Sequence, residues 1–321
     1  MRVYDTLTRS HVELPPPPAE IGMYVCGPTV YQRAHIGNAR PFVVFSWLRN
    51  WLREQGYAAT FVHNVTDVND KIYDAAPGRS AELAREATRW YLEDTGDLGL
   101  GMPDEMPLAT ESIPEIVALI EELVDGGTAY AVEGDVYFRV ARFSEYGRLS
   151  GQRPDQLEEQ EPNPLKEDPR DFALWKATKP HEDTSWPSPW GLGRPGWHIE
   201  CSAMAEKLLG PVFEIHGGGI DLRFPHHENE LAQSRGAVRE FAQPLGPAAA
   251  ADDGLESATS RLGCRYRHKY AARKAAGSAR CRAHRGPRCS RRDSTRGVHT
   301  DARRRAFRRD RDEWGCLRGS F

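Results

Sequence analysis

The feature that most constrains the fold is a closely spaced succession of apolar strand, amphipathic helix and apolar strand near the N-terminus. Residues 22–31 (GMYVCGPTVY) predict a buried strand that leaves into a loop at Gly27-Pro28, and residues 58–68 (AATFVHNVTDV) predict a second strand. A helix is predicted over Pro41–Gln55, and Gly56 stands where a helix C-terminal glycine belongs. The broad apolar face of this helix contains Phe42, Val43, Phe45, Trp47, Leu48, Trp51 and Leu52. Strand, helix and strand with short turns form a βαβ unit, which implies an α/β fold with a parallel sheet.

The chain continues with a mixture of helical and strand patterns. Residues 80–130 predict helix, most clearly where one apolar stripe is formed by Ile113, Ile116, Leu119, Ile120 and Leu123. Residues 134–140 (GDVYFRV) alternate like a strand. Residues 150–195 are rich in Pro, Gly, Trp and charge, and predict a connecting insertion with little periodicity. Beyond the insertion we expect helices over 198–209 and 225–235, and a strand over 213–222.

Composition excludes two classes of protein. No apolar run reaches the roughly 18–20 residues that a bilayer-spanning helix needs, and the N-terminus has no hydrophobic signal core. The six cysteines are too sparse for a disulfide framework in a chain of 321 residues. We therefore expect a cytoplasmic protein with reduced thiols, some of them on a metal.

The character of the chain changes after about residue 242. The formal net charge of −3 hides an asymmetry, because arginine clusters gather beyond residue 260. Residues 244–321 contain no Ile, no Met and a single Val, Val298. Such a segment buries too little apolar surface to offset its ordering entropy. We expect residues 243–321 to form a disordered basic tail.

Four side chains are candidate zinc ligands, namely Cys26, Cys201, His226 and Glu230. Two thiolates, an imidazole and a carboxylate make a chemically sensible zinc set, and the last two lie four residues apart on one helix face. The alternatives are ordinary ones. A strand cysteine is usually a small buried hydrophobe, and a His-x-x-x-Glu pair is more often a solvated surface pair. The metal interpretation requires the fold to bring distant residues together.

Two further strings suggest phosphate and nucleoside binding. His35-Ile36-Gly37-Asn38 precedes the first predicted helix, whose start offers unpaired N–H groups to a phosphate. The alternative is an ordinary helix-entry turn with Asn38 as the cap. Gly217-Gly218-Gly219 before Asp221 would let a flat ligand lie against the backbone, with the carboxylate accepting from a ribose. The alternative there is a flexible turn.

Taken together, these strings resemble one family. MYVCGPTVY, AHIGNARPFVVF, FVHNVTDVNDKI, DFALWK, GRPGWHIECSAMA and HGGGIDLRFPHHENELAQS stand in the order seen in cysteinyl-tRNA synthetases, across roughly residues 1–242. The resemblance implies a class I synthetase catalytic domain, a Rossmann-type parallel sheet split by a connective insertion. It implies four parts: residues 1–130 as the first half of the catalytic domain, 131–196 as the insertion, 197–242 as the second half with the zinc site, and 243–321 as a tail outside the family pattern.

The resemblance also implies roles for individual residues. In that family the positions of Cys26, Cys201, His226 and Glu230 hold one Zn²⁺, which binds the substrate thiolate. Gly27, Thr66 and Trp197 match positions that line the amino-acid pocket. His35 and Asn38 match the catalytic signature that grips ATP, here with Asn in place of the last His. Gly37, Gly217, Gly218, Gly219 and Asp221 complete the expected ATP site. Serine differs from cysteine by one atom, and a soft cation that prefers thiolate supplies the selectivity that packing cannot.

The reaction implied is cysteine–tRNA ligation. ATP, with Mg²⁺, and cysteine form cysteinyl-adenylate, and the cysteinyl group then moves to tRNA(Cys). We expect a monomer whose partners are cysteine, ATP and tRNA(Cys), with no membrane. Two alternatives stay open, the related cysteine ligase of mycothiol synthesis and an inactive zinc-binding fragment.

The sequence departs from the family pattern near residue 242. The second class I signature, KMSKS, is expected a short way after HHENE but no such string follows, and the anticodon-binding domain is missing. We expect weak activity from this chain for that reason. A shift of reading frame would explain the change of character, and a natural basic tail that binds RNA non-specifically is the alternative.

Overall fold

The computed structural model describes residues 1–153, 161–237 and 249–250. The strands are β1 (Arg2–Asp5), β2 (Ser10–Glu13), β3 (Glu20–Val25), β4 (Ala58–His63), β5 (Ala129–Val132), β6 (Asp135–Phe138), β7 (Phe172–Ala177), β8 (Gly193–Pro195), β9 (Ile215–Gly217) and β10 (Ala249–Ala250). The α-helices are α1 (Ile36–Glu54), α2 (Asp70–Ala75), α3 (Ser80–Gly96), α4 (Ile113–Asp125), α5 (Trp197–Leu209) and α6 (Glu228–Gly236). Short helical turns are η1 (Ala109–Glu111), η2 (Val140–Arg142), η4 (Ile220–Leu222) and η5 (Arg223–His227). Apart from β10, the predicted tail lies outside the described residues.

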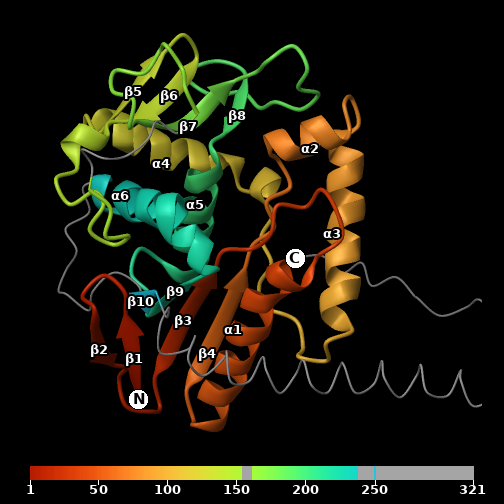
Figure 1. Ribbon diagram of the computed structural model, residues 1–321, viewed down its shortest axis with the longest axis vertical. Helices are drawn as coiled ribbons and strands as arrows, with labels where there is room; N and C mark the ends of the chain where they lie inside the picture. The colour runs from red at the N-terminus through yellow and green to blue at the C-terminus, as the bar shows by residue number, and fades with distance from the viewer. Residues whose placement is uncertain (154–160, 238–248, 251–321) are drawn as a thin grey trace, which may run out of the picture. The chain divides into compact units, whose positions relative to one another are not determined.

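A parallel sheet confirms the βαβ prediction. Its strand order is β10-β9-β3-β4, every neighbouring pair is parallel, and β1 and β2 form a separate antiparallel pair (Figure 1). β3 ends at Val25, directly before the loop predicted at Gly27-Pro28, and Gly27 passes close to the segment that follows β4. A Cβ at Gly27 would lie 1.6 Å from the Asn64 carbonyl oxygen. The strand therefore ends where the backbones come closest.

Helix α1 is longer than the predicted Pro41–Gln55 at its N-terminal end. His35 caps it, and the His35 Nδ1 atom accepts from the Gly37 N–H at 3.0 Å. Pro41 thus lies inside the helix, where the prediction placed it at the start. The C-terminal end is as predicted, with Gly56 at φ +88°. Trp51, expected on the buried face, is 42% exposed, so that face is narrower than predicted.

The predicted helical region 80–130 consists of α3 and α4 with an extended segment between them. All five residues of the predicted stripe on α4 are buried. Residues 99–101 break the helix, because Gly99 and Gly101 take φ values of +66° and +78°. The following segment runs along β4, with the Asp104 N–H donating to the Phe61 carbonyl oxygen at 2.8 Å. The helical prediction is wrong for this segment.

A second, antiparallel sheet of order β5-β6-β7-β8 corrects the prediction for 150–195. β6 agrees with the predicted strand over 134–140. β7 and β8 were not predicted, since that stretch showed little periodicity. β7 begins with four consecutive buried residues, and such a short apolar run has no alternation to detect. β7 pairs with β6 across more than thirty residues of sequence, as in the pairing of Phe172 with Phe138.

The last described elements largely follow the prediction. α5 covers the expected 198–209. The strand expected over 213–222 is limited to β9, which ends at the first of three consecutive glycines, and the chain then turns into η4. α6 begins three residues after the expected Pro225. Phe224, directly before that proline, has an extended backbone with φ −136° and ψ 133°, as residues before proline favour.

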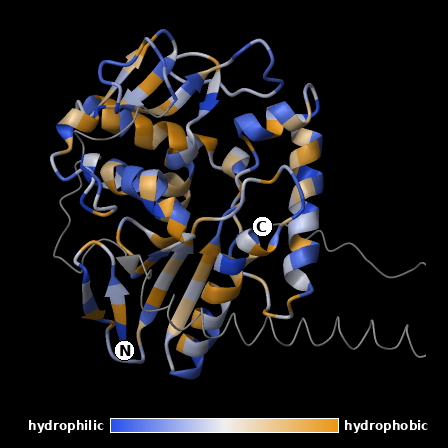
Figure 2. Cartoon of the chain, viewed as in Figure 1, coloured by the Kyte–Doolittle hydropathy of each residue, from blue (hydrophilic) through white to orange (hydrophobic). Residues whose placement is uncertain are grey.

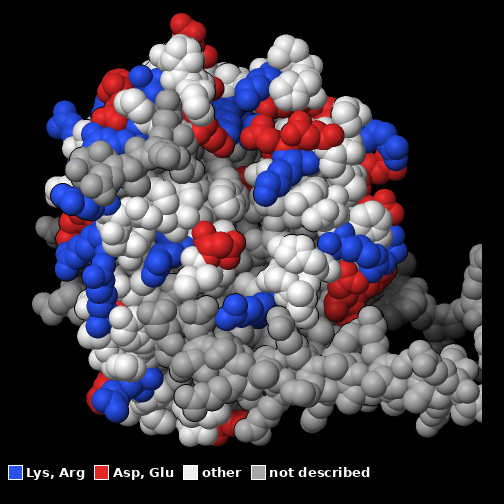
Figure 3. Space-filling view, in the orientation of Figure 1, with Lys and Arg blue, Asp and Glu red and all other residues white. Residues whose placement is uncertain are grey.

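Helices α4 and α5 cover the core between the two sheets. A large cluster of buried residues joins α4 and the antiparallel sheet to α5 and α6, and a second lies between α1 and the parallel sheet. The apolar character of α4 is evident in Figure 2. On the face drawn in Figure 3, acidic and basic side chains are interspersed. No helix among the described residues is long and apolar enough to cross a membrane.

Candidate functional site

The candidate site lies at the carboxyl edge of the parallel sheet. Cys26 follows β3, Asn64 follows β4, and Gly217 ends β9. The Cys26 N–H donates to the Gly217 carbonyl oxygen at 3.0 Å, so these strand ends are held side by side. Ligands in open parallel α/β sheets bind beyond this edge, where neighbouring strands lead to different faces.

Four of the predicted residues converge there to form a group we call the metal set, Cys26, Cys201, His226 and Glu230. All four are buried, and their candidate ligand atoms lie within 4.8 Å of one another. The Cys26 Sγ atom lies 3.3 Å from Glu230 Oε1, and the His226 Nε2 atom lies 2.8 Å from the same oxygen. Residues up to 204 positions apart in sequence therefore meet. Neither ordinary alternative, an isolated core cysteine or a solvated surface pair, describes this group.

Two histidines that the sequence analysis missed lie against the metal set. His216, His227, Cys26 and Glu230 form a second group with ligand atoms within 4.8 Å of one another. The His216 Nε2 atom lies 3.0 Å from Glu230 Oε2 and 3.5 Å from Cys26 Sγ. The His227 Nε2 atom is buried and has no hydrogen-bond partner among the described residues. His216 lies in the string HGGG and His227 lies in HHENE, and both strings contain other predicted site residues. Their position beside those residues is the signal that could have identified them.

Charge in the metal set is strongly shared. Burial alone would raise the pKa of Glu230, but His216 and His226 hold it well below its usual value. Burial opposes the charged form of His226, and Glu230 and Cys201 nevertheless raise its pKa to about 10. Burial also opposes the Cys201 thiolate, yet the thiol of Cys26 and the ring of His226 lower that pKa to about 6. Burial and the neighbouring Cys201 raise the pKa of Cys26 well above its usual value. These shifts favour the charged forms of Cys201, His226 and Glu230.

We call Gly27, Thr66 and Trp197, the residues predicted to bind cysteine, the cysteine set. The Trp197 ring lies 4.3 Å from the His226 ring. Thr66 is buried, and its N–H donates to the Pro28 carbonyl oxygen at 3.0 Å.

Asn64, which the sequence analysis missed, connects the cysteine set to the metal set. Its Oδ1 atom accepts from the Gly27 N–H at 2.8 Å and lies 3.7 Å from Cys201 Sγ. It also lies 3.4 Å, through Nδ2, from the Thr66 hydroxyl. A fully buried amide directly after a strand was the available signal.

The predicted phosphate-binding string forms the N-terminus of α1. His35, Gly37 and Asn38 are all exposed. His35 is the capping residue, so the alternative in which Asn38 caps the helix is wrong. A Cβ at Gly37 would lie 2.8 Å from a carbon of the His35 ring, so the glycine leaves that ring in place. The string therefore presents a helix N-terminus to solvent.

The three predicted glycines after β9 differ in their surroundings. A Cβ at Gly217 would lie 2.1 Å from Phe45 of α1, and one at Gly218 would lie 2.7 Å from His227 Nε2. Both glycines are therefore required by packing within the protein. A Cβ at Gly219 would lie 2.3 Å from Asp221 Oδ1, and the Asp221 side chain is exposed. Within this string, Gly219 and Asp221 remain the more accessible candidates for contact with ATP.

Comparisons with known proteins identify the family. The sequence model of the family described as tRNA synthetases class I (C) catalytic domain matches residues 14–244. Cysteine–tRNA ligase of Lacticaseibacillus casei is 51% identical over 245 residues, covering 73% of this chain and 52% of that protein. Cysteine–tRNA ligase of Frankia casuarinae is 52% identical over 257 residues, covering 78% of this chain and 48% of that protein. The chain spans about half the length of these relatives.

One solved structure completes the comparison. Mycobacterium tuberculosis methionyl-tRNA synthetase bound by methionyl-adenylate aligns with a TM-score of 0.48 and 12% identity, over 67% of this chain and 55% of that one. The assignment to a family depends on the sequence match, since a likeness at this level adds nothing to it.

Proposed function

The chain belongs to the family of class I (C) tRNA synthetase catalytic domains, and we propose that it is the cysteine-activating part of a cysteine–tRNA ligase. The observation that carries the proposal is the convergence of Cys26, Cys201, His226 and Glu230 into one buried group. The relatives named above, about half of whose length the chain spans, are cysteine–tRNA ligases. No observation favours the cysteine ligase of mycothiol synthesis.

The metal set fits a zinc ion by its chemistry. Sulfur, nitrogen and carboxylate oxygen are the ligand atoms of four-coordinate zinc sites in proteins. Glu230 and Cys201 raise the pKa of His226, which favours a proton on that ring, and a divalent cation would replace that proton. The zinc would supply a soft Lewis acid that holds the thiolate of substrate cysteine and excludes serine.

The remaining roles belong to the protein's own residues. Trp197, whose ring lies against His226, and Thr66, which Asn64 links to the metal set, would orient the amino acid, while Gly27 lets the chain pass close to Asn64. His35, Gly37 and Asn38 would present the start of α1 to the phosphates of ATP, which arrive with Mg²⁺. Gly217, Gly218, Gly219 and Asp221 would adjoin the adenosine. Most of the catalytic effect would come from positioning and from stabilising charge on the transferring phosphoryl group.

The reaction we propose joins the cysteine carboxylate to the α-phosphate of ATP and releases pyrophosphate. The adenylate would then pass its cysteinyl group to tRNA(Cys) in the whole protein. Location in the cytoplasm and a monomeric state stay predictions.

Zinc content and cysteine selectivity test the proposal. We expect the purified 321-residue chain to contain about one zinc, the load of a single four-ligand site. Cys201→Ala should lose it, whereas Cys264→Ala, a cysteine outside the metal set, should retain it. Calorimetric titration should show cysteine binding that exceeds serine binding by about 100-fold or more. ATP–pyrophosphate exchange that depends on cysteine would support the activation step. A zinc-loaded chain that binds both amino acids equally would contradict the proposal.

A further inference from the structure

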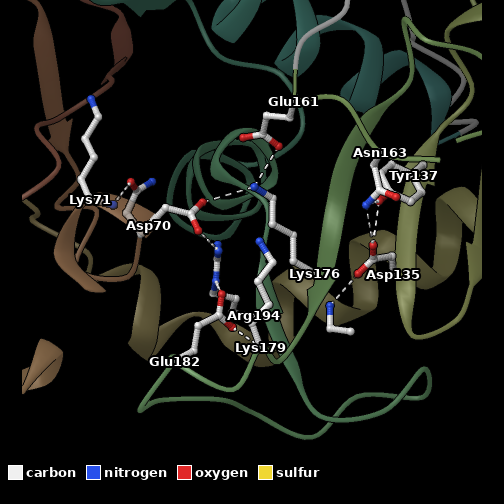
Figure 4. A network of polar contacts seen from close by, with 12 residues as sticks. Asp70, Lys71, Asp135, Tyr137, Glu161, Asn163, Lys176, Lys179, Glu182 and Arg194 are labelled. Atoms are coloured by element: carbon white, nitrogen blue, oxygen red, sulfur yellow. Dashed lines mark hydrogen bonds and ion pairs between the residues drawn. The ribbon is translucent and has the colours of Figure 1, made fainter. Parts of the chain in front are cut away.

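A buried arginine connects the two segments that carry the cysteine set. Arg194 lies in β8, three residues before Trp197, and its side chain is 3% exposed. Asp70 begins α2, four residues after Thr66. The Arg194 Nη2 atom donates to Asp70 Oδ1, and Figure 4 shows these side chains pointing toward each other from separate elements. The contact joins the connection after β4 to the connection before α5.

The other contacts of Arg194 hold its guanidinium in one orientation. The Nε atom donates to Glu182 Oε1 at 3.0 Å, and the Glu182 side chain is completely buried. The guanidinium carbon lies 5.4 Å from the centre of the Tyr73 ring. An arginine fork can serve two carboxylates at fixed angles, which a lysine ammonium cannot do. Arg194 therefore sets where Asp70 lies relative to β8.

Neighbouring contacts strengthen the same junction. The Lys176 Nζ atom lies 3.4 Å from Asp70 Oδ2 and 2.8 Å from Glu161 Oε2. The loop before β8 also contacts α2 and the first residue of α3. Asp183 accepts from the Ser80 N–H at 2.8 Å, and the Tyr73 hydroxyl lies 2.8 Å from the Thr184 hydroxyl. These contacts tie the loop of residues 182–184 to α2 and α3.

Both ends of the junction are rigidly connected to the cysteine set. On one side, the Gly196 N–H donates to the Leu174 carbonyl oxygen at 2.8 Å, and a Cβ at Gly196 would lie 2.1 Å from the Ala173 carbonyl oxygen. Trp197 follows directly. On the other side, Val68 is buried, and the Asp67 carboxylate accepts from both the backbone N–H and the hydroxyl of Thr110. A displacement at Asp70 or Arg194 would thus be transmitted to Thr66 and Trp197.

We propose that Arg194, acting through Asp70 and Glu182, is a positioning residue that fixes Thr66 and Trp197 relative to each other beside the metal set. Its effect on cysteine binding rests on the proposed function, whereas its effect on the backbone does not. The polar and ring contacts of Arg194 among the described residues are with Asp70, Glu182 and Tyr73 and include no member of the metal set, so we expect zinc content to be unchanged when Arg194 is replaced. Small displacements of groups that orient a substrate reduce affinity or rate strongly.

Asp70→Ala is the sharpest variant for testing this inference. Asp70 is 41% exposed, and its removal leaves Arg194 paired with Glu182, so the fold retains its buried ion pair. Glu115→Ala is the matched control. Glu115 is 37% exposed, lies in the first turn of α4 and pairs with Lys207 of α5 at 2.7 Å, away from the junction. Arg194→Lys adds a second variant that keeps the charge but loses the fork.

Two measurements on the zinc-loaded chain decide the inference. We expect cysteine affinity to fall about 10-fold in Asp70→Ala and in Arg194→Lys, with zinc content and ATP affinity unchanged. We expect backbone amides of residues 64–68 and 195–199 to exchange hydrogen faster than in wild type. Glu115→Ala should match wild type in both measurements. The loss in the double variant should be smaller than the sum of the two single losses, because both changes remove the contact between Arg194 and Asp70.

The outcomes separate the inference from the proposed function. If Asp70→Ala retains wild-type exchange in both segments and wild-type cysteine affinity, the positioning role is wrong. Equal losses of cysteine and ATP affinity would mean a general loss of structure, and would also overturn it. A wild-type chain that binds zinc but no cysteine would contradict the proposed function alone. The exchange comparison would still decide whether Arg194 positions the two segments.

Discussion

The buried carboxylates of the two sheet regions are satisfied in different ways. Beside the antiparallel sheet, Asp171 accepts from the Val140 N–H at 2.9 Å, the Tyr130 hydroxyl at 3.0 Å and the Asp168 N–H at 3.2 Å. Beside the parallel sheet, the Glu230 carboxylate contacts the side chains of Cys26, His216 and His226. The first carboxylate is thus held mainly by backbone, and the second by side chains that can titrate or bind metal.

This difference separates a structural role from a chemical one. Backbone donors remain in place as long as the fold does, so the Asp171 carboxylate fixes the junction of β6 and β7. The partners of Glu230 can exchange a proton for a cation without moving the backbone. Nearby, both carboxyl oxygens of buried Glu200 have no partner among the described residues. Glu200 directly precedes Cys201 of the metal set, so we infer that its unsatisfied carboxyl marks this side of the site, as expected where function takes precedence over stability.

Removal of zinc should give the largest effect and should be confined to the parallel-sheet region. With free zinc at 1,000 times its dissociation constant, binding adds about 4 kcal/mol to the free energy of unfolding, so chelation should remove that amount. Hydrogen exchange should increase around Cys26, Cys201 and α6, while β5–β8 should change little. Denaturant unfolding with and without chelator measures the first effect. An equal increase in hydrogen exchange in both sheets would contradict the difference between the two regions.

Acid should also destabilise the parallel-sheet region first, because a buried histidine lies in β4. His63 Nδ1 lies 2.9 Å from the Val25 carbonyl oxygen and Nε2 lies 2.7 Å from the Tyr91 hydroxyl. Burial lowers the pKa of His63 to about 4 from an ordinary value of 6.5. Between these values the unfolded chain binds a proton that the folded protein does not, so stability falls as pH falls from 6.5 toward 4. The full loss is about 3 kcal/mol.

A glutamine at position 63 provides the test of that acid effect. His63→Gln cannot take up the proton, so the difference in unfolding free energy between wild type and variant should shrink between pH 7 and pH 4. The described strands of the antiparallel sheet contain no histidine. An unchanged difference across this pH range would mean that the imidazole is not held neutral by the fold.

The sequence predicted the parallel region better than the antiparallel one, for a physical reason. The unit β3-α1-β4 is local, and its helix periodicity and turn glycines are visible within about forty residues. β7 and β8 owe their existence to pairing with distant strands, as in Trp175 with Pro195, which no local pattern records. Exposure of Trp51 was likewise set by tertiary packing.

The candidate site divides in the same manner. The metal set was predicted through strings that resemble a family, and the structure brings its members together. Asn64, His216 and His227 were missed, because each acts by closing a contact between segments rather than by forming a motif. The Arg194 junction was missed for the same reason, since its partners come from α2, β8 and the loop before it.

Loss of the backbone-held carboxylate should give an intermediate effect in the antiparallel region. Asp171→Asn replaces one acceptor oxygen with a donor amide among three donors, and leaving a buried donor unpaired costs about 2 kcal/mol. We expect this loss in denaturant unfolding, with zinc content unchanged. Asp168→Asn is the control, because its carboxylate mainly pairs with Arg170 near the surface. Loss of zinc in Asp171→Asn but not in the control would show that the two regions are not separable.

Replacement of Glu200 should have the smallest effect on stability. Glu200 is fully buried on α5, and an ionised carboxylate without a partner is too costly to bury. Burial, reinforced by Cys201, raises the pKa of Glu200 well above its usual value, which favours the neutral carboxyl. Glu200→Gln keeps its shape and neutrality, and should change the free energy of unfolding by about 0.5 kcal/mol or less.

The Glu200→Gln variant is informative when its free energy of unfolding is compared with that of Asp171→Asn. If Glu200→Gln lowers the free energy of unfolding as much as Asp171→Asn does, the Glu200 carboxyl has a structural role. Its lack of hydrogen-bond partners would then not mark the site. Glu200→Met, of similar volume and without polar atoms, extends the test. A stability equal to or above wild type would mean that the carboxyl is retained for a reason other than folding. Cysteine titration of the same variant would then show whether that reason lies in the site.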